Sequence, residues 1–311
     1  MAFNPILNNP YDDPKFHYQT DVDGNLDHED IQKARRPFVA VAPPQPNKQP
    51  VDQALFSINE VAPAYGTHLI NLLRKEVGEW RRSGYNGTTR ITKSLLSYWF
   101  LDTLRDNKLF FVQREALETA IWLNEVAPNC NPGTNILNKL RQANQTQDTN
   151  VALNRVAFKM ATGTGKTVVM AGLILYHFFN REEYRNDVRF ADNFLLIAPG
   201  ITIRDRLSVL IPEPTNRGLL ARDYYRQRAL VPSGWDEQLN KLNAKLVITN
   251  YHAFEPRTLQ GNKRSPFDGK AGAEPAKEDF NQVLKRILPA FRTHSRLLIL
   301  NDEAHHCYLP L

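Results

Sequence analysis

The spacing of apolar residues predicts two helices in the first third of the chain. Apolar residues recur at helical spacing over residues 65–82, which predicts a helix that buries Leu69, Leu72, Leu73, Val77 and Trp80. The glycines at both ends of residues 84–87 should end it, because glycine favours turns. A second helix is expected over residues 92–105, with a buried face made of Leu95, Leu96, Trp99, Phe100 and Leu104. We interpret the aromatic residues of that face as core rather than as a surface for stacking nucleic-acid bases.

From residue 108 onward, helical and strand patterns alternate. A helix is predicted over residues 112–125, and the polar run RQANQTQDTN at 141–150 predicts a surface loop. Short, continuously apolar strands are predicted at 155–160, 193–199, 245–250 and 296–301. Continuous apolar strands separated by crossovers indicate a parallel sheet covered on both faces, so the fold class is α/β. Residues 255–277 have the glycine, proline and lysine content of an exposed loop.

Residues 1–50 differ from the rest because they contain eight prolines and no sustained periodicity. This composition predicts an extended arm with turns. The chain is therefore expected to have three parts: the arm at 1–50, a helical region at 51–106 and an α/β domain at 107–311.

Charge and composition narrow the possibilities only slightly. The net charge is +6, and residues 151–311 contain 23 Lys or Arg against 16 Asp or Glu. This surplus is compatible with a nucleic-acid partner, yet it is small enough for an ordinary solvated surface, which charge alone favours. No apolar run reaches eighteen residues and no secretory signal is present, and Cys130 and Cys307 give no framework for disulfides or zinc. These features together predict a cytoplasmic protein without a membrane span.

The segment FKMATGTGKTVVM, residues 158–170, is typical of a loop that holds phosphate. It joins a predicted strand to an apolar helix, and glycines in such a loop let successive N–H groups point at phosphate oxygens. Lys166 can reach the β- and γ-phosphates of ATP, and the Thr167 hydroxyl can bind Mg²⁺. The residues predicted to bind ATP here are Thr162, Gly163, Thr164, Gly165, Lys166 and Thr167.

One position departs from the usual phosphate-loop pattern. Met160 stands where the general motif begins with glycine, and Gly163 is expected to supply the close backbone approach instead. The alternative is a glycine-rich turn before an ordinary helix, which the Lys-Thr pair in register makes the weaker interpretation.

A second motif follows in RLLILNDEAHHCY, residues 296–308. In a P-loop ATPase, an acidic residue at the end of a neighbouring apolar strand holds Mg²⁺ together with the Ser or Thr of the loop. Asp302 is therefore predicted to bind Mg²⁺, and Glu303, the next carboxylate, to orient and deprotonate the attacking water. A strand ending in a polar turn would explain this pair alone, but not its combination with the upstream loop. We expect no metal centre at His305, His306 and Cys307, because adjacent side chains point apart and no distant ligand pair is evident.

These motifs resemble those of superfamily 2 helicases, which are P-loop NTPases. MATGTGKT (160–167) and DEAH (302–305) resemble motifs I and II, and residues 195–207 and 246–254 are similar to motifs that contact DNA. FFVQREALETAIWL (110–123) resembles the glutamine-bearing segment that reads adenine, which nominates Gln113. By this resemblance His305 couples the ATP site to the rest of the motor. The candidates for contact with the DNA backbone are Thr202, Arg204, Thr249, Asn250 and His252, although capping of the following helix explains them equally well.

The opening segments NPILNNPYDDPKFHYQTDVDGN and ARRPFVAVAPPQP, together with NDEAHHCY, narrow the resemblance to type III restriction endonuclease Res-like subunits. The resemblance implies an ATP- and Mg²⁺-dependent DNA helicase or translocase fused to an endonuclease, with two RecA-like domains and a possible methyltransferase or specificity subunit as partner.

Only six residues follow the DEAH motif, so the chain is expected to be an N-terminal fragment with an incomplete first RecA-like domain. No arginine finger, second RecA-like domain or nuclease domain is evident in it. We therefore expect weak nucleotide binding, negligible turnover and incomplete folding from the isolated chain. The alternatives are a nucleotide-gated DNA-binding module completed by a partner, an inactive fragment, and a DEAH-type RNA or repair helicase.

Overall fold

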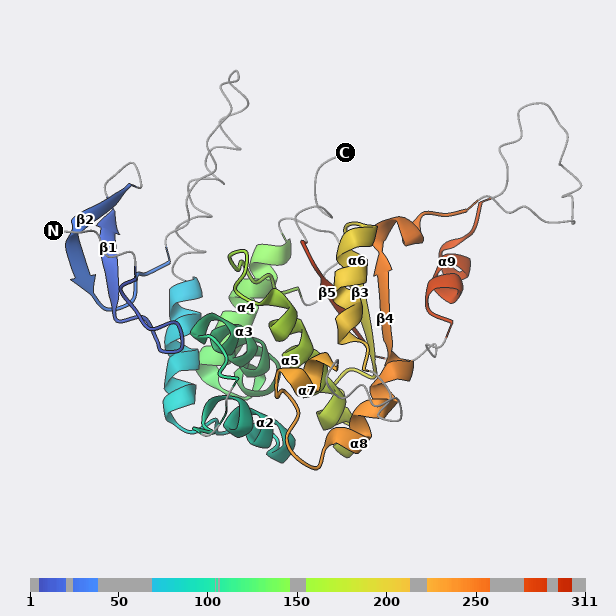
Figure 1. Cartoon of the computed structure of the whole chain (residues 1–311), viewed down its shortest axis with the longest axis horizontal. Helices are drawn as coiled ribbons and strands as arrows, with labels where there is room; N and C mark the ends of the chain where they lie inside the picture. Colours follow the sequence, from blue (N-terminus) through green and yellow to red (C-terminus); the bar gives the residue numbers. More distant parts are fainter. Residues whose placement is uncertain are drawn as a thin grey trace, which may run out of the picture. The chain divides into compact units, whose positions relative to one another are not determined.

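The computed structural model describes residues 6–20, 25–38, 69–103, 105, 107–145, 155–212, 223–257, 277–289 and 296–303 (Figure 1). The chain divides into two compact units, Met1–Val169 and Met170–Leu311, which are described separately. In the part of the chain that the structure describes, no helix is long and apolar enough to cross a membrane.

The first unit opens with a two-stranded antiparallel hairpin of β1 (Phe16–Thr20) and β2 (Leu26–Lys33). The register shifts between Tyr18 and Gln19, where a bulge interrupts the ladder. No proline lies between Pro14 and Pro37, so every residue of this stretch can donate to a ladder. The predicted arm therefore contains regular structure that its overall proline content does not suggest.

Two helices follow close to their predicted positions. Residues 69–82 are helical, with Leu69, Val77 and Trp80 buried, as predicted; Leu72 and Leu73 are half-buried. Helix α2 (Arg90–Phe100) buries Leu95, Leu96 and Trp99.

The predicted extent of the second helix is wrong at both ends. Thr89 caps α2 by accepting a hydrogen bond from Thr92 N at 3.1 Å, so the helix begins two residues early. At the other end α2 stops before Leu101, and the buried Arg105 donates from Nε to the Asn107 carbonyl at 2.7 Å instead of continuing the helix. Phe100 is half-buried, and Leu104 lies outside the described residues.

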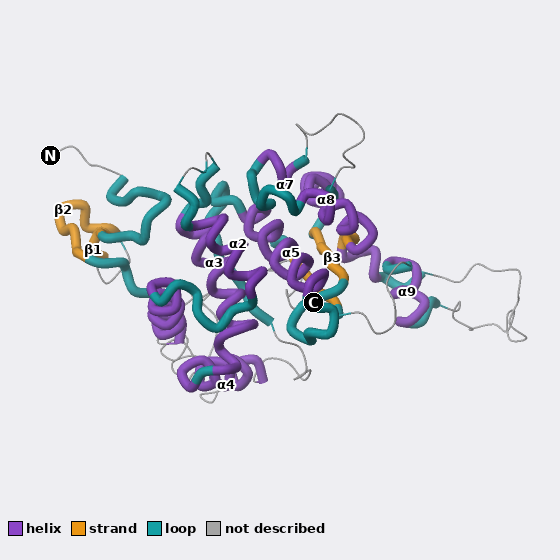
Figure 2. The backbone as a smooth tube through the Cα atoms, turned by 90° about the horizontal axis from the view of Figure 1, so that it is seen from below, coloured by secondary structure: helices purple, strands orange, loops and turns teal. Residues whose placement is uncertain are grey.

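Helix α3 (Phe111–Ile121) continues as a short π-helix, η1 (Trp122–Val126), and a 3₁₀ turn, η2 (Ala127–Asn129). This confirms the predicted helix over 112–125. Helix α4 (Asn131–Gln145) packs back against η1 and η2 (Figure 2). The contact is close because a Cβ on Gly133 would lie 2.3 Å from Ala127 Cα. The loop predicted over 141–150 is wrong for 141–145, because α4 continues through them, and 146–150 lie outside the described residues.

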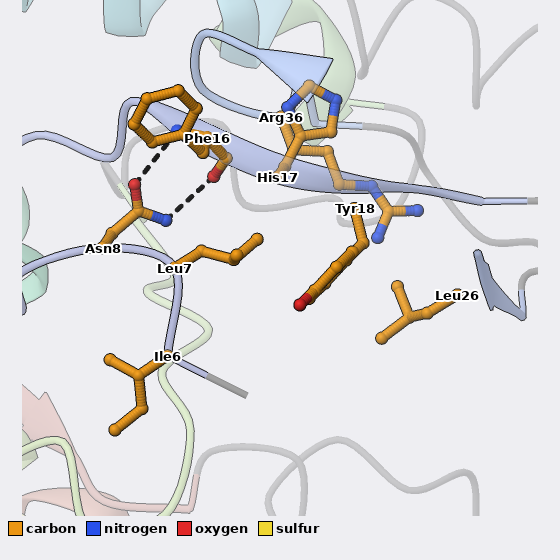
Figure 3. A pocket seen from close by; sticks show the side chains of 8 residues that line it. All are labelled: Ile6, Leu7, Asn8, Phe16, His17, Tyr18, Leu26 and Arg36. Carbon is orange, nitrogen blue, oxygen red and sulfur yellow. Dashed lines mark hydrogen bonds between the residues drawn. The ribbon is translucent and has the colours of Figure 1, made fainter. Parts of the chain in front are cut away.

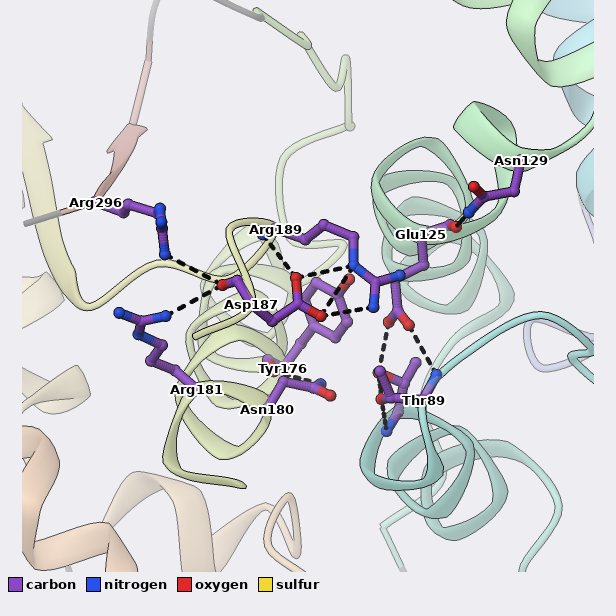
Figure 4. A network of polar contacts seen from close by, with 10 residues as sticks. Thr89, Glu125, Asn129, Tyr176, Asn180, Arg181, Asp187, Arg189 and Arg296 are labelled. Carbon is purple, nitrogen blue, oxygen red and sulfur yellow. Dashed lines mark hydrogen bonds and ion pairs between the residues drawn. The ribbon is translucent and has the colours of Figure 1, made fainter. Parts of the chain in front are cut away.

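Buried carboxylates hold α3 and η1 in place. The Glu118 side chain is fully buried and accepts hydrogen bonds from Arg81 Nε at 2.8 Å, Arg114 Nε at 2.8 Å and Tyr85 Oη at 2.6 Å. Burial, together with the Glu118 carboxylate, raises the pKa of Tyr85. Glu125 accepts from Thr89 N at 2.8 Å and so fixes the start of α2 (Figure 4).

The second unit is built on a parallel sheet in the order β4-β3-β5 (Figure 1). Its strands are β3 (Asn193–Ala198), β4 (Leu246–Asn250) and β5 (Leu297–Asn301), which confirms three of the four predicted strands and the α/β fold class. The fourth prediction, a strand over 155–160, is wrong. Within the described parts of the chain these residues pair with no strand, and Val156 is exposed rather than buried in a ladder.

The boundary between the two units falls within helix α5 (Lys166–Glu183), after Val169. The residues of α5 from Val168 to Phe179 are buried almost without exception. Helix α6 (Ile201–Leu207) packs against β3 and β4. The remaining described elements are short: η3 (Ser208–Leu210), α7 (Tyr224–Gln227), α8 (Asp236–Leu239), η5 (Asn240–Lys245), η6 (Tyr251–Phe254) and α9 (Phe280–Ile287). Most of the predicted loop over 255–277 lies outside the described residues.

The amino ends of β3 and β5 are joined by a polar network (Figure 4). The Asp187 carbonyl accepts from Arg181 Nη1 at 3.1 Å and from Arg296 Nη1 at 3.2 Å. The Arg189 guanidinium, hydrogen-bonded to the Asp187 carboxylate, lowers the pKa of that carboxyl.

Candidate nucleotide-binding site

The loop before α5 turns at two glycines with positive φ. Gly163 and Gly165 adopt φ angles of +81° and +84°, which L-residues with a side chain rarely adopt. Thr164 closes the turn by donating from Oγ1 to the Ala161 carbonyl at 2.7 Å. The 18-residue helix α5 begins at Lys166, so the partial positive charge of its N-terminus lies beside the loop. This arrangement attracts an anion.

The side chains predicted to act from this loop are accessible to different degrees. Thr162 is exposed, whereas Lys166 and Thr167 are half-buried in the first turn of α5. No side-chain atom crowds the Cβ position of Gly163, since nothing lies within 4 Å of it. The space next to the Gly163 main chain is therefore open.

Gln113 contacts this loop directly. Its side chain is only 4% exposed, its Oε1 accepts from Phe110 N at 3.0 Å, and its Nε2 donates to the Thr164 carbonyl at 2.8 Å. The first bond satisfies the main-chain N–H of the residue that precedes α3. The residue nominated to read adenine is thus bonded at both ends of its amide to the main chain.

The acidic pair follows β5 at the carboxyl edge of the sheet. Asp302 N donates to the Ile197 carbonyl at 3.0 Å, and Glu303 N donates to Asp302 Oδ1 at 3.1 Å. Both residues are half-buried, and Glu303 adopts a φ of +52°, which is uncommon for a residue with a side chain. His305, His306 and Cys307 lie outside the described residues.

Sequence reasoning did not single out Asn301, the last residue of β5. Its Oδ1 is buried and has no hydrogen-bond partner among the described residues. The sequence did offer a sign of it, because Asn301 is a polar residue at the end of an otherwise apolar strand.

The parallel register brings two of the predicted DNA-contacting residues, Thr249 and Asn250, to the same edge of the sheet as the acidic pair. Ile197 of β3 lies opposite Thr249 of β4 on one side and opposite Asn301 of β5 on the other. Thr202 and Arg204 lie on α6, and Thr202 is exposed.

Some of these candidates already have partners within the chain. Asn250 caps η6, since its Oδ1 accepts from Ala253 N at 3.0 Å. His252 Nδ1 lies 2.8 Å from Glu255 Oε1, and Arg204 Nη2 lies 3.0 Å from Asp205 Oδ1. The helix-capping explanation therefore accounts for Asn250, whereas the exposed His252 and Thr202 remain accessible to a polyanion.

The oxygen atoms that the phosphate loop and the acidic pair offer are suitable ligands for magnesium. The Thr167 hydroxyl and the Asp302 carboxylate are hard oxygen donors, which Mg²⁺ prefers. Among the described residues, no group of three or more His, Cys, Asp or Glu side chains could hold a metal by itself.

A hollow of about 390 Å³ lies elsewhere, on the N-terminal hairpin, and contains none of the predicted site residues (Figure 3). The hollow is open to solvent. On one side of it, Asn8 Oδ1 accepts a hydrogen bond from Phe16 N at 3.0 Å. Its lining residues are Ile6, Leu7, Asn8, Phe16, His17, Tyr18, Leu26 and Arg36.

The parallel sheet, the glycine-rich loop and the helix that follows it define a P-loop NTPase-like α/β protein. The family model of the type III restriction enzyme, res subunit, matches residues 107–309, well over half of the chain. The chain therefore belongs to this family, whose domain implies a helicase-like, ATP-dependent motor that generally uses ATP with Mg²⁺. Searches of curated proteins and of solved structures found no match.

Proposed function

We propose that this chain is the ATP-binding motor part of a DNA helicase or translocase that serves a restriction endonuclease. The observation that carries the proposal is the loop with positive φ at Gly163 and Gly165, placed at the N-terminus of α5. The acidic pair at the carboxyl edge of a parallel sheet supports it, because ligands of open α/β sheets bind at that edge.

Each residue of the motifs has a role in this proposal. Lys166 binds the β- and γ-phosphates of ATP as a point charge. Thr167 and Asp302 would hold Mg²⁺, which neutralises negative charge on the phosphates when it is bound. Glu303 orients a water molecule and takes its proton while the water oxygen attacks the γ-phosphorus and the bond to ADP breaks.

The DNA part of the proposal concerns the carboxyl edge of the sheet. The exposed Thr202 and His252 and the half-buried Arg204 and Thr249 would contact phosphates of the backbone without reading sequence. Recognition of a target sequence would come from a methyltransferase or specificity subunit as partner. His305 would couple the nucleotide site to the rest of the motor.

The test is nucleotide binding by the 311-residue chain, measured by calorimetry with ATP and Mg²⁺. Lys166→Ala should weaken binding about 10- to 100-fold, because a charge-assisted contact contributes about 1.5–3 kcal/mol. Lys159→Ala is the matched control, since Lys159 is an exposed lysine shortly before the loop. Failure of the unmodified chain to bind ATP, or an equal loss in both variants, would contradict the proposal.

The polynucleotide partner is tested with labelled duplex DNA and duplex RNA of the same sequence, and with a second DNA duplex of scrambled sequence. Binding to DNA that falls steeply with salt and does not depend on sequence is expected from backbone contacts. Preference for RNA would favour an RNA helicase instead. Glu303→Gln should retain ATP binding and abolish any hydrolysis, whereas loss of binding would assign Glu303 a different role.

A further inference from the structure

The Gln113 amide joins the start of α3 to the middle of the phosphate loop. Its acceptor is used by Phe110 N at 3.0 Å and its donor by the Thr164 carbonyl at 2.8 Å. Both distances are those of well-formed hydrogen bonds, and the side chain is only 4% exposed. Both the oxygen and the nitrogen of the amide are therefore fixed by hydrogen bonds to the main chain.

The bond to Thr164 fixes more than one carbonyl. The Thr164 C=O and the Gly165 N–H belong to the same planar trans peptide, in which the two groups point in opposite directions. When Nε2 of Gln113 holds the carbonyl on its own side, the Gly165 N–H must point away from Gln113. In a phosphate loop it is the N–H groups that contact the phosphate, so this bond sets the direction of one of them.

The packing around Gly165 supports this. A Cβ at Gly165 would lie 2.2 Å from Gln113 Nε2, so the amide is seated directly against the loop backbone. Glycine at this position serves two needs, the positive φ and the space for the amide.

Helix α3, which carries Gln113, is itself firmly placed. Phe111 N donates to the Pro10 carbonyl at 2.8 Å, and Arg35 forms an ion pair with Glu115. One turn further on, the buried Glu118 accepts from Arg81 and Arg114. Helix α3 is thus positioned by contacts with the arm and with Arg81 that do not involve the loop.

We infer that Gln113 is a positioning residue that presets the phosphate loop, and that it acts on the polyphosphate irrespective of the base. Reading adenine would require the amide to give up one or both of its main-chain partners. This inference deepens the proposed function and rests on it, because it concerns how the same loop holds ATP.

The experiment compares the affinities of ATP, GTP and inorganic tripolyphosphate, each with Mg²⁺, for the full chain and two variants. Gln113→Ala should weaken all three by the same factor, about tenfold, the equivalent of one hydrogen bond of about 1.4 kcal/mol. Gln113→Glu separates the two contacts. A carboxylate can still accept from Phe110 N but cannot donate to Thr164, so it should lose as much affinity as alanine.

The outcomes distinguish the alternatives. A loss confined to ATP, with tripolyphosphate unaffected, would make Gln113 an adenine reader and overturn the inference. Near-normal affinity in Gln113→Glu would show that only the cap of α3 matters, and would overturn it as well. If Gln113→Ala bound tripolyphosphate normally while remaining folded by circular dichroism, the loop would not need the amide. No binding of any of the three by the unmodified chain would contradict the proposed function itself.

Discussion

The Nε2 atom of Gln113 lies 2.8 Å from the carbonyl oxygen of Thr164, fifty-one residues further along the chain. This one hydrogen bond ties the first turn of α3 to the turn between Gly163 and Gly165. Because the same amide also accepts from Phe110 N, the start of a helix and the shape of a phosphate loop depend on one side chain. The stability of the loop and the placement of α3 should therefore be coupled, and substitutions on either side can measure the coupling.

The two loop glycines provide a matched pair for the first prediction. Gly163→Ala and Gly165→Ala each place a side chain at a φ above +80°, which costs about 1–2 kcal/mol. Only the second also pushes Gln113 away from Thr164, because only there is the Cβ position occupied. In urea unfolding, Gly165→Ala should be the more destabilising by about 1 kcal/mol, the net contribution of one hydrogen bond.

A double-mutant cycle tests the cause of that difference. In a Gln113→Ala background the extra cost of Gly165→Ala should disappear, leaving both glycine substitutions equally harmful. An extra cost that persisted without the Gln113 side chain would mean that the backbone at Gly165, and not its contact with the amide, accounts for the effect.

The second prediction concerns the buried Glu118. Glu118→Ala would leave the guanidinium groups of Arg81 and Arg114 and the Tyr85 hydroxyl without their shared acceptor. Removing one member of a buried ionic group costs about 3–5 kcal/mol. The control is Glu79→Ala, because Glu79 and Lys75 are mostly exposed and 3.9 Å apart, so its cost should be within about 0.5 kcal/mol of zero. Similar denaturation midpoints for the two variants would contradict this account.

The sequence predicted the sheet better than the surroundings of the phosphate loop, for physical reasons. Strands β3, β4 and β5 are short apolar runs that were recognised by composition, and their parallel pairing followed from the long segments between them. Residues 155–160 have a similar composition, yet they have no ladder partner in the described chain, and an apolar run becomes a strand only by pairing. Composition cannot show which neighbour a strand will have.

The partners of single polar side chains could not be predicted from the sequence either. Gln113 was nominated from a motif, but its bond to the Thr164 carbonyl depends on a contact between segments fifty-one residues apart. Glu118 was not singled out from the sequence, and only packing reveals that it is fully buried among two arginines and a tyrosine. Sequence spacing predicts which face of a helix is apolar, but it does not predict which charges will be buried in pairs.

The third prediction is a pH dependence that arises from His177 in α5. Burial of its ring lowers the pKa of His177 to about 4, from an ordinary value of 6.5. Its Nδ1 accepts from Ala191 N at 3.2 Å, which requires the deprotonated nitrogen. Below pH 6.5 the unfolded chain takes up a proton that the folded chain does not, so stability is complete above pH 6.5 and falls as the pH approaches 4.

The loss should reach at most about 3 kcal/mol at pH 4, since one pKa unit corresponds to about 1.36 kcal/mol. His177→Asn is the control because its Oδ1 can accept from Ala191 N without titrating, and its stability should vary less over this range. The measurement is the free energy of unfolding at steps from pH 7 to pH 4. Parallel curves for the two proteins would exclude His177 as the source of the pH dependence.

The last prediction concerns Asp192, which is hydrogen-bonded to Arg296, the residue before β5. Asp302 follows the other end of this strand. Asp192 Oδ2 accepts from Arg296 N at 3.0 Å, Asp192 N donates to the Arg296 carbonyl at 2.8 Å, and Arg181 pairs with the same carboxylate. These contacts hold the residue before β5 against the start of β3. Without the carboxylate the amino end of β5 should open more often, because the main-chain N–H of Arg296 loses its acceptor.

Hydrogen exchange of the β5 amides measures this directly. In Asp192→Ala, residues 297–301 should exchange about tenfold faster, as expected from the loss of about 1.4 kcal/mol of local stability, while the amides of β4 change little. Asp205→Ala is the matched control, since Asp205 forms an exposed ion pair with Arg204 on α6 and should leave β5 unaffected. Unchanged exchange in Asp192→Ala would mean that the ladder with β3 alone holds β5, and that the register placing Asp302 beside Ile197 needs no support from its amino end.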